Sequence, residues 1–260
     1  MPAARAQDMR GLDTMQTPGE MLGWEGVGRL DLPGGFCTGA LIAPDIVLTA
    51  AHCVHDRATG APVEARGMIF RAGFHRGQSI VQRRVLRWVV PGGYVPTAGG
   101  QIGSSAIAQD VALLKLESAV SSAQADPFRV HEIPPEGTDV SVVSYGRGRE
   151  DVLSREAGCT MVRRYRGGIM GFDCNVTFGS SGAPVFLREN GRLRILSVVS
   201  GGTDLGRSGG EAFGPSLPDT VARLAARLRR DDARPSVSAG ARRVTVGGNR
   251  EGIGARFVRP

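Results

Sequence analysis

The chain has 260 residues and a formal net charge of +7, a length typical of one all-β domain or of one domain built from two barrels. Almost all of its cations are arginines, with Lys115 as the single lysine, and most of these arginines are scattered along the chain. Aromatic side chains are few and do not alternate with basic ones, which argues against nucleic-acid binding. No stretch is apolar and long enough to cross a bilayer.

Residues 1–21 are polar and irregular, and we predict that they form a loosely attached leader. The sequence Ala4, Arg5, Ala6, followed by Gln7, is typical of the small-residue end of a signal-peptide cleavage site. The hydrophobic segment that should precede such a site is missing. We therefore interpret these residues as the remnant of a signal or pro-segment.

From Gly23 onward, short runs of Val, Ile and Leu are interrupted by Gly, Pro and Asp. Apolar runs of this length between turn residues are typical of strands, and their number predicts an all-β barrel or sandwich. The runs lie at residues 40–42, 46–48, 85–90, 111–116, 140–144, 183–187 and 193–199.

Two polar segments and one helix complete the pattern. Residues 92–109 are rich in Gly, Ser and Ala and are predicted to form a loop, whereas residues 119–136 are predicted to join two halves of the structure. Apolar residues recur at helical spacing between Val221 and Leu228, which predicts a helix over about 217–230, with Ser216 or Asp219 as its cap.

Residues 231–260 contain few apolar side chains and are predicted to be a flexible basic tail. Its arginines, from Arg242 to Arg259, leave open weak binding to an anionic envelope surface. The alternative, a tail that is merely solvated, is favoured by composition.

The chain contains an even number of cysteines, and none of them forms a C-x-x-C pair; they are Cys37, Cys53, Cys159 and Cys174. This pattern favours two disulfides in an oxidising compartment over a cytosolic metal site. Segments 159–163 and 170–174 are predicted to be paired strands tied by a disulfide, with a reduced or metal-bound pair as the alternative. Zinc binding by the cysteines with His52 and His55 is disfavoured by the spacing.

Two residues stand where apolar strands end or begin. His52 follows a β-type run and two alanines, and a catalytic imidazole at such a position would be held in a defined orientation. Asp110 opens a strongly apolar strand, so a buried carboxylate there would need a hydrogen-bond donor such as an imidazole N–H. Taken alone, His52 is more typical of a core histidine, and Asp110 is more typical of a turn aspartate.

A glycine-rich segment lies at residues 179–185. Glycines on both sides of Ser180 and Ser181 permit a tight turn and the close approach of a carbonyl substrate. Such a turn can direct the N–H groups of Gly179 and Ser181 at one point, as an oxyanion hole requires. An isolated match of this kind is usually an ordinary Gly/Ser loop.

Read together, residues 49–53, 110–114 and 179–184 closely resemble the His, Asp and Ser motifs of the chymotrypsin-like serine proteases. They also occur in the chain order His, Asp, Ser, which separates that family from other serine hydrolases. The resemblance extends over about residues 22–230. It implies an all-β fold of two antiparallel six-stranded barrels, at about 22–118 and 128–215, followed by the C-terminal helix.

The same resemblance implies a mechanism. Ser181 would attack the peptide carbonyl, His52 would move the proton, and Asp110 would hold the imidazole in the required tautomer. The N–H groups of Gly179 and Ser181 would stabilise the oxyanion, and no metal or cofactor is implied. The family's cysteine spacing also implies a disulfide between Cys37 and Cys53.

One departure from the family concerns activation. Vertebrate digestive members carry Asp immediately before the nucleophile, where it pairs with a newly released N-terminus, whereas this chain has Ser180. Activation through that ion pair is therefore not expected. In this respect the chain is similar to small bacterial members that resemble the glutamyl endopeptidases.

A second departure concerns specificity. The resemblance puts Asn175 at the base of the primary pocket, where trypsin-like members have Asp, so a preference for Arg or Lys is not expected. Val176 and Val199 stand where the glutamyl enzymes use Thr and His. A neutral or apolar substrate side chain is therefore favoured. Ser200, Gly201 and Gly202 resemble the edge segment that pairs with the substrate backbone.

The sequence thus predicts a monomeric, secreted or periplasmic bacterial endopeptidase that acts on protein or peptide substrates. A catalytically silent binding protein of the same fold is the main alternative, because a complete triad can be idle when the oxyanion loop is flipped or the pocket is closed. Surface binding through the basic tail is a further alternative.

Overall fold

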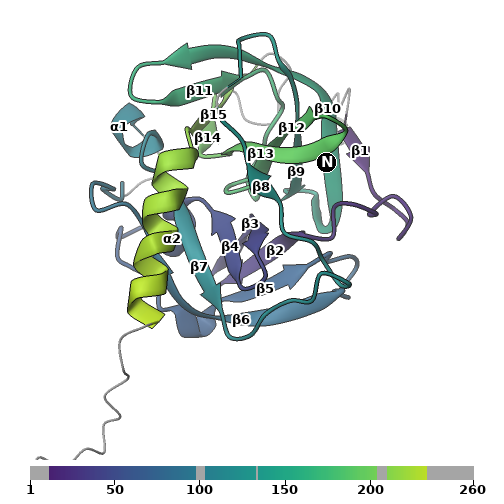
Figure 1. Cartoon of the computed structure of the whole chain (residues 1–260), viewed down its shortest axis with the longest axis vertical. Coiled ribbons are helices and arrows are strands. Elements are labelled where there is room, and N and C mark those ends of the chain that lie inside the picture. Colours follow the sequence, from purple (N-terminus) through teal and green to yellow (C-terminus); the bar gives the residue numbers. More distant parts are fainter. Residues whose placement is uncertain (1–11, 98–102, 133, 204–209, 233–260) are drawn as a thin grey trace, which may run out of the picture.

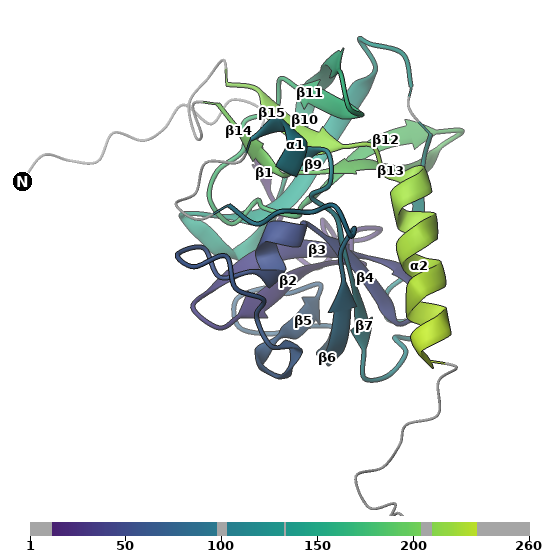
Figure 2. The same ribbon diagram turned by 90° about the vertical axis from the view of Figure 1, so that its left-hand side faces the viewer.

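The structure, a computed structural model, describes residues 12–97, 103–132, 134–203 and 210–232. Its regular structure is mostly β-strand, in two halves that lie against each other, with helix α2 running along one side (Figure 1; Figure 2). The predicted fold class, an all-β chymotrypsin-like protein with a C-terminal helix, is confirmed.

The first half is a closed six-stranded barrel in the order β2-β3-β4-β7-β6-β5, and every pairing in it is antiparallel. Its strands are β2 (Val27–Leu32), β3 (Gly35–Ala43), β4 (Ile46–Thr49), β5 (Ile69–Ala72), β6 (Val81–Val89) and β7 (Ala112–Leu116). Two short 3-10 helices, η1 (Ala51–Val54) and η2 (Ala65–Gly67), and the short helix α1 (Ser104–Ile107) lie in its connections.

The second half is one curled sheet in the order β14-β15-β11-β10-β9-β12-β13-β8, with β1 paired to β10. Its strands are β1 (Leu12–Thr14), β8 (Arg129–Val130), β9 (Asp139–Gly146), β10 (Arg149–Tyr165), β11 (Ile169–Phe172), β12 (Pro184–Glu189), β13 (Arg192–Val198), β14 (Gly201–Gly202) and β15 (Ala212–Pro215). The resemblance implied a six-stranded barrel here. The pairings of the described residues instead leave β14 and β8 as the ends of an open sheet, because β8 is a two-residue strand parallel to β13.

The predicted apolar runs all fall in or beside observed strands, and residues 117–138 join the two halves. The sequence analysis missed most of β10. This strand is long and carries many charged side chains: its last four residues are exposed, and exposed or partly exposed positions interrupt the buried ones in the rest. A strand with one solvated face lacks the continuous apolar run that marks a buried strand.

Residues 12–21 differ from the predicted leader. Leu12–Thr14 form β1, which pairs with β10, and the main-chain N–H of Met15 donates to the carbonyl oxygen of Leu153 at 2.9 Å. Met15 and Met21 are each 5% exposed and belong to the same core cluster as Trp24. The burial of two methionines attaches this segment to the second half.

Helix α2 (Pro218–Asp232) was predicted with nearly the right bounds, but the predicted caps were wrong. The carbonyl oxygen of Leu217 accepts the first helical hydrogen bond, from the N–H of Val221 at 2.8 Å. Pro218 therefore holds the first helical position, where its missing N–H costs nothing. Asp219 lies in the first turn, and the basic tail from residue 233 lies outside the described residues. Among the described residues, no helix is long and apolar enough to cross a membrane.

The two halves share one hydrophobic core. Phe186 of β12 packs edge-on against Trp24 and Phe128, with ring centroids 5.3 Å and 4.7 Å away. The same cluster includes Leu48 of the barrel and Val143 of the curled sheet, all buried. Since interiors pack as densely as organic crystals, this shared core holds the two halves in one relative position.

We expect Phe186→Ala to lower the free energy of unfolding by about 3 to 5 kcal/mol, because it opens a cavity where the halves meet. Urea unfolding followed by tryptophan fluorescence measures this loss. Leu86→Ala is the matched control, since Leu86 is 56% exposed. Equal losses in the two variants would contradict a shared core.

Candidate active site

His52 and Asp110 form a buried pair at one end of the barrel. His52 lies on η1 directly after β4, and Asp110 lies between α1 and β7. The Nδ1 atom of His52 is 2.7 Å from Oδ2 of Asp110, and the main-chain N–H of His52 donates to Oδ1 at 2.8 Å. Asp110 is fully buried, so these bonds satisfy a carboxylate that water cannot reach.

Ser200 gives the same carboxylate a third donor. Its hydroxyl donates to Oδ2 of Asp110, and both residues are buried. The sequence analysis placed Ser200 among the substrate-contacting residues, and it did not foresee this bond. Because Ser200 precedes β14 in the curled sheet, the bond connects the two halves at the site.

The loop that carries Ser181 depends on two glycines. Gly179 and Gly182 have φ angles of +93° and +74°, in the left-handed region that favours glycine. A Cβ atom on Gly182 would lie 2.0 Å from Oγ1 of Thr49 and 2.6 Å from the carbonyl oxygen of Thr38. The turn can therefore press against the barrel only because glycine occupies this position.

Two main-chain N–H groups of this loop stay unpaired. The N–H groups of Ser180, Gly182 and Ala183 donate to carbonyl oxygens, whereas those of Gly179 and Ser181 donate to no described residue. The carbonyl oxygen of Phe178 accepts from the N–H of Arg147 at 2.7 Å. In a planar trans peptide this bond directs the N–H of Gly179 the opposite way.

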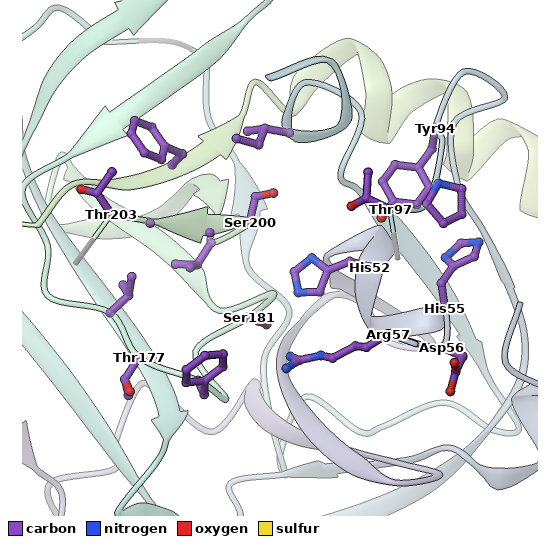
Figure 3. A pocket seen from close by; sticks show the side chains of 18 residues that line it. His52, His55, Asp56, Arg57, Tyr94, Thr97, Thr177, Ser181, Ser200 and Thr203 are labelled. Carbon is purple, nitrogen blue, oxygen red and sulfur yellow. The ribbon is translucent and has the colours of Figure 1, made fainter. Parts of the chain in front are cut away.

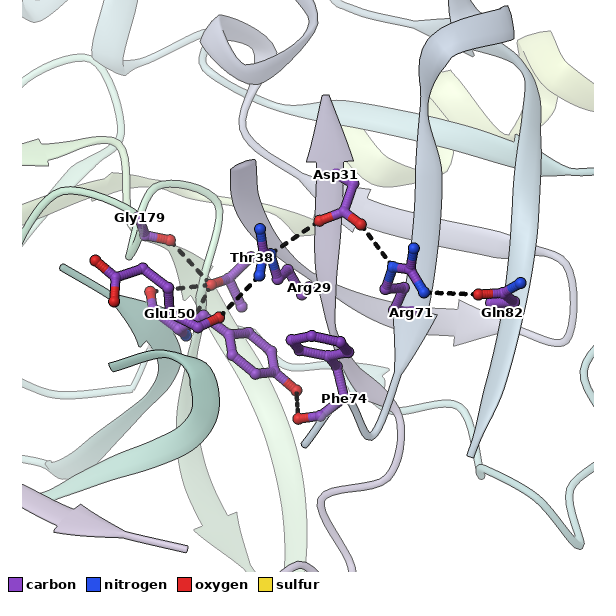
Figure 4. A network of polar contacts seen from close by, with 9 residues as sticks. Arg29, Asp31, Thr38, Arg71, Phe74, Gln82, Glu150 and Gly179 are labelled. Carbon is purple, nitrogen blue, oxygen red and sulfur yellow. Dashed lines mark hydrogen bonds and ion pairs between the residues drawn. The ribbon is translucent and has the colours of Figure 1, made fainter. Parts of the chain in front are cut away.

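Thr38 of β3 connects the barrel to this loop (Figure 4). Its N–H donates to the carbonyl oxygen of Ser181 at 2.9 Å, and its hydroxyl donates to that of Gly179 at 3.0 Å. The same hydroxyl oxygen accepts from the N–H of Tyr145 at 3.0 Å. The sequence contains no signal for this role, because a threonine in a strand is unremarkable.

A buried arginine lies behind the loop. The guanidinium of Arg149 donates to the carbonyl oxygen of Ser144, to Oγ of Ser144 at 3.0 Å and to Oγ of Ser180 at 3.4 Å. The two serine hydroxyls are themselves 3.1 Å apart. Ser180 therefore contacts a positive charge that belongs to this chain's own β10.

Burial of Arg149 disfavours its charged form, whereas nearby carboxylates favour it. Burial lowers the pKa of Arg149 to about 10, and the charges of Glu156 and Glu150 partly offset that effect. Burial also raises the pKa of Glu156, against the opposing influence of the main chain of Asn175 and the charge of Arg149. Arg149 and Glu156 are both buried, and the charge of each favours the charged form of the other.

A cavity of about 430 Å³ opens between the halves (Figure 3). Both His52 and Ser181 line it, and Figure 3 shows the imidazole on one side of the cleft and Ser181 on the other. Of the residues predicted for substrate binding, five also line it: Val176, Val199, Ser200, Gly201 and Gly202. The structure thus brings two of the three predicted triad residues and most of the predicted substrate-binding residues to one cavity.

Asn175 is the exception, because it does not line this cavity. It follows the disulfide-bonded Cys174, and its main chain hydrogen-bonds to Glu156. The sequence analysis missed Thr203, Phe213 and Tyr94 in this cavity, the last with its ring 5.3 Å from that of His55. These residues come from separate loops and strands, so no local motif marks them.

Two disulfides are present in the structure. Cys37–Cys53 joins β3 to the residue after His52, and Cys159–Cys174 ties β10 to the end of β11, as the hairpin prediction required. His52 lies close to the first pair, with the three candidate ligand atoms within 4.8 Å of one another. Since both sulfurs are bonded to each other, they offer no thiolate to a metal ion.

Comparisons with known proteins agree with this geometry. A family model described as a trypsin-like peptidase domain matches residues 37–194. A protein named cercarial protease, from Schistosoma mansoni, is 28% identical over 215 residues, which cover 75% of this chain and 77% of that protein.

Solved structures share the fold at lower identity. A Glu endopeptidase superposes with a TM-score of 0.65 at 18% identity, covering 86% of this chain and 97% of that one. The thermostable serine protease AL20 from an extremophilic microorganism gives 0.63 at 21% identity, covering 78% and 96%. The protease Anisep from Arthrobacter nicotinovorans gives 0.62 at 20% identity, covering 77% and 93%.

We expect Arg149→Met to lower the free energy of unfolding by about 3 kcal/mol, because it leaves the buried oxygens of Ser144 and Ser180 without their donor and removes a positive charge that favours the ionised Glu156. Adding Glu156→Gln to this variant should restore part of the loss, as a double-mutant cycle in urea would measure. Arg147→Met is the control, since Arg147 is exposed. A larger loss of unfolding free energy in the double variant than in Arg149→Met would contradict an interaction between Arg149 and Glu156.

Proposed function

Because the chain belongs to the trypsin-like peptidase domain family, we propose that it is a serine endopeptidase that cleaves peptide bonds through an acyl-enzyme on Ser181. One observation carries the proposal. His52 is held by the buried Asp110 and lines the same cavity as Ser181, whose own N–H and that of Gly179 donate to no residue that the structure describes.

The proton transfers follow from the His52–Asp110 bond. With Nδ1–H donated to Asp110, Nε2 of His52 is free to accept a proton. It takes the proton of the Ser181 hydroxyl as Oγ bonds to the substrate carbonyl carbon, and then gives that proton to the amine as the peptide bond breaks. Water repeats the sequence on the ester and restores Ser181.

The negative charge that forms on the carbonyl oxygen needs donors that are already in place. The N–H groups of Gly179 and Ser181 would supply them. The bond from Arg147 to the carbonyl oxygen of Phe178 supports this role, because it opposes rotation of the peptide that carries the Gly179 N–H. This arrangement argues against the silent alternative with a flipped oxyanion loop.

The acyl side of the substrate would enter the cavity described above. Gly201 and Gly202 form β14 at the edge of the curled sheet, and this edge can accept an extended peptide as an added strand. Val176, Val199 and Phe213 give the neighbouring pocket apolar walls. These walls support a neutral or apolar side chain before the scissile bond. The two disulfides support secretion or a periplasmic location.

A fluorophosphonate probe tests the nucleophile directly. We expect the purified, disulfide-intact protein to be labelled once, at Ser181, and Ser181→Ala to lose the label. Ser180→Ala is the matched control, because its hydroxyl is adjacent but buried. Absence of labelling in folded protein, before and after limited proteolysis of residues 1–11, would favour the catalytically silent alternative.

Thr38→Val should lower kcat by about tenfold with a smaller change in KM, because the loop loses the bond that orients Gly179. The measurement is steady-state cleavage of a quenched fluorescent peptide that the wild type cleaves. Ser197→Ala is the control, since its buried hydroxyl bonds to Pro215 instead. Equal kcat values for Thr38→Val and wild type would contradict this role.

A further inference from the structure

A second cavity, of about 420 Å³, lies on the other side of His52. Its walls include Phe36 and Cys37 from the β2–β3 hairpin and Gly179 from the loop of Ser181. The edge strand β14 lines the first cavity and not this one. On the proposed function, a peptide paired with β14 on its acyl side must pass His52 and continue into the second cavity with its leaving-group residues.

Arg57 stands where the two cavities meet, because it lines both of them. Its side chain extends below His52 toward the Ser181 side of the cleft (Figure 3). Among the described residues it makes no hydrogen bond and no ion pair, and it is exposed. A positive charge at the scissile bond is therefore available to a ligand.

The turn that carries Arg57 is well defined. The Asp56 carboxylate accepts the N–H groups of Ala58 and Thr59 at 3.0 and 2.8 Å, and the Thr59 hydroxyl at 2.8 Å. Hydrogen bonding to Thr59 lowers the pKa of Asp56. Asp56 is thus used within the turn, and it fixes the backbone of Arg57 without pairing with its guanidinium.

The other charges of the second cavity have partners. Arg147 lies over the Phe178 ring at 4.4 Å. Glu150 accepts the N–H of Gly148 at 2.8 Å, and this bond, with the charges of Arg29 and Arg147, lowers its pKa. Arg57 is the one cation of this cavity whose charge no described residue engages.

We propose that Arg57 is a specificity-determining residue that selects an acidic side chain at the first residue after the scissile bond. A guanidinium binds a carboxylate with two parallel hydrogen bonds, which a neutral amide of the same shape cannot match. The inference rests on the proposed function, since it concerns the leaving group of the same reaction.

The test uses quenched peptides that differ only at the residue after the scissile bond, with Glu, Gln or Lys there. The wild type should cleave the Glu peptide with a kcat/KM about three- to fivefold above that of the Gln peptide, the range of an exposed ion pair. High salt should reduce this ratio toward one. In Arg57→Glu the order should invert, with the Lys peptide cleaved fastest.

Arg192→Glu is the matched control, because Arg192 is an exposed arginine at the start of β13 and lines neither cavity. It should keep the wild-type ratio. Equal cleavage of the Glu and Gln peptides by wild type, or an unchanged ratio in Arg57→Glu, would overturn the proposal. Protein that neither cleaves any peptide nor takes the fluorophosphonate label would instead refute the endopeptidase function itself.

Discussion

The site depends on the contact between Thr38 of the barrel and the loop of Ser181. Through its N–H and its hydroxyl, Thr38 holds the carbonyl oxygens of Ser181 and Gly179, both on the other half. Gly182 makes this approach possible because it has no Cβ. His52 and Ser181 come from different halves. Their relative position is therefore set by this contact and by the shared core around Phe186.

Two buried charged groups near the site, Asp110 and Arg149, are held by complementary partners. Asp110 receives donors from His52 and Ser200, and Arg149 reaches the hydroxyls of Ser144 and Ser180. Where related digestive enzymes use an Asp and a released N-terminus behind the nucleophile, this chain puts a neutral Ser180 against an internal arginine. The loop is therefore supported by a contact within the fold.

Much of this arrangement could be predicted from local sequence. Strands with continuous apolar runs were found, as was the hairpin of Cys159 and Cys174, because burial of both faces or a nearby cysteine pair leaves a local trace. Most of strand β10 was missed because its buried positions are interrupted by exposed charged ones. The segment from Leu12 to Met21 was missed because its partner, β10, lies far away in the chain. The predicted helix cap was wrong because Pro218 begins the helix, and a proline at this position needs no side-chain cap.

The sequence alone determined the chemistry that the site can hold: the motifs of His52, Asp110 and Ser181, their order, the cysteines and the glycines of the turn. Each is a local requirement of residue type or backbone conformation. Only the tertiary structure decided that Ser200 donates to Asp110, that Asn175 does not line the cavity and that Arg57 lines both cavities beside His52. These are contacts between segments distant in sequence, and their geometry follows from how the two halves pack.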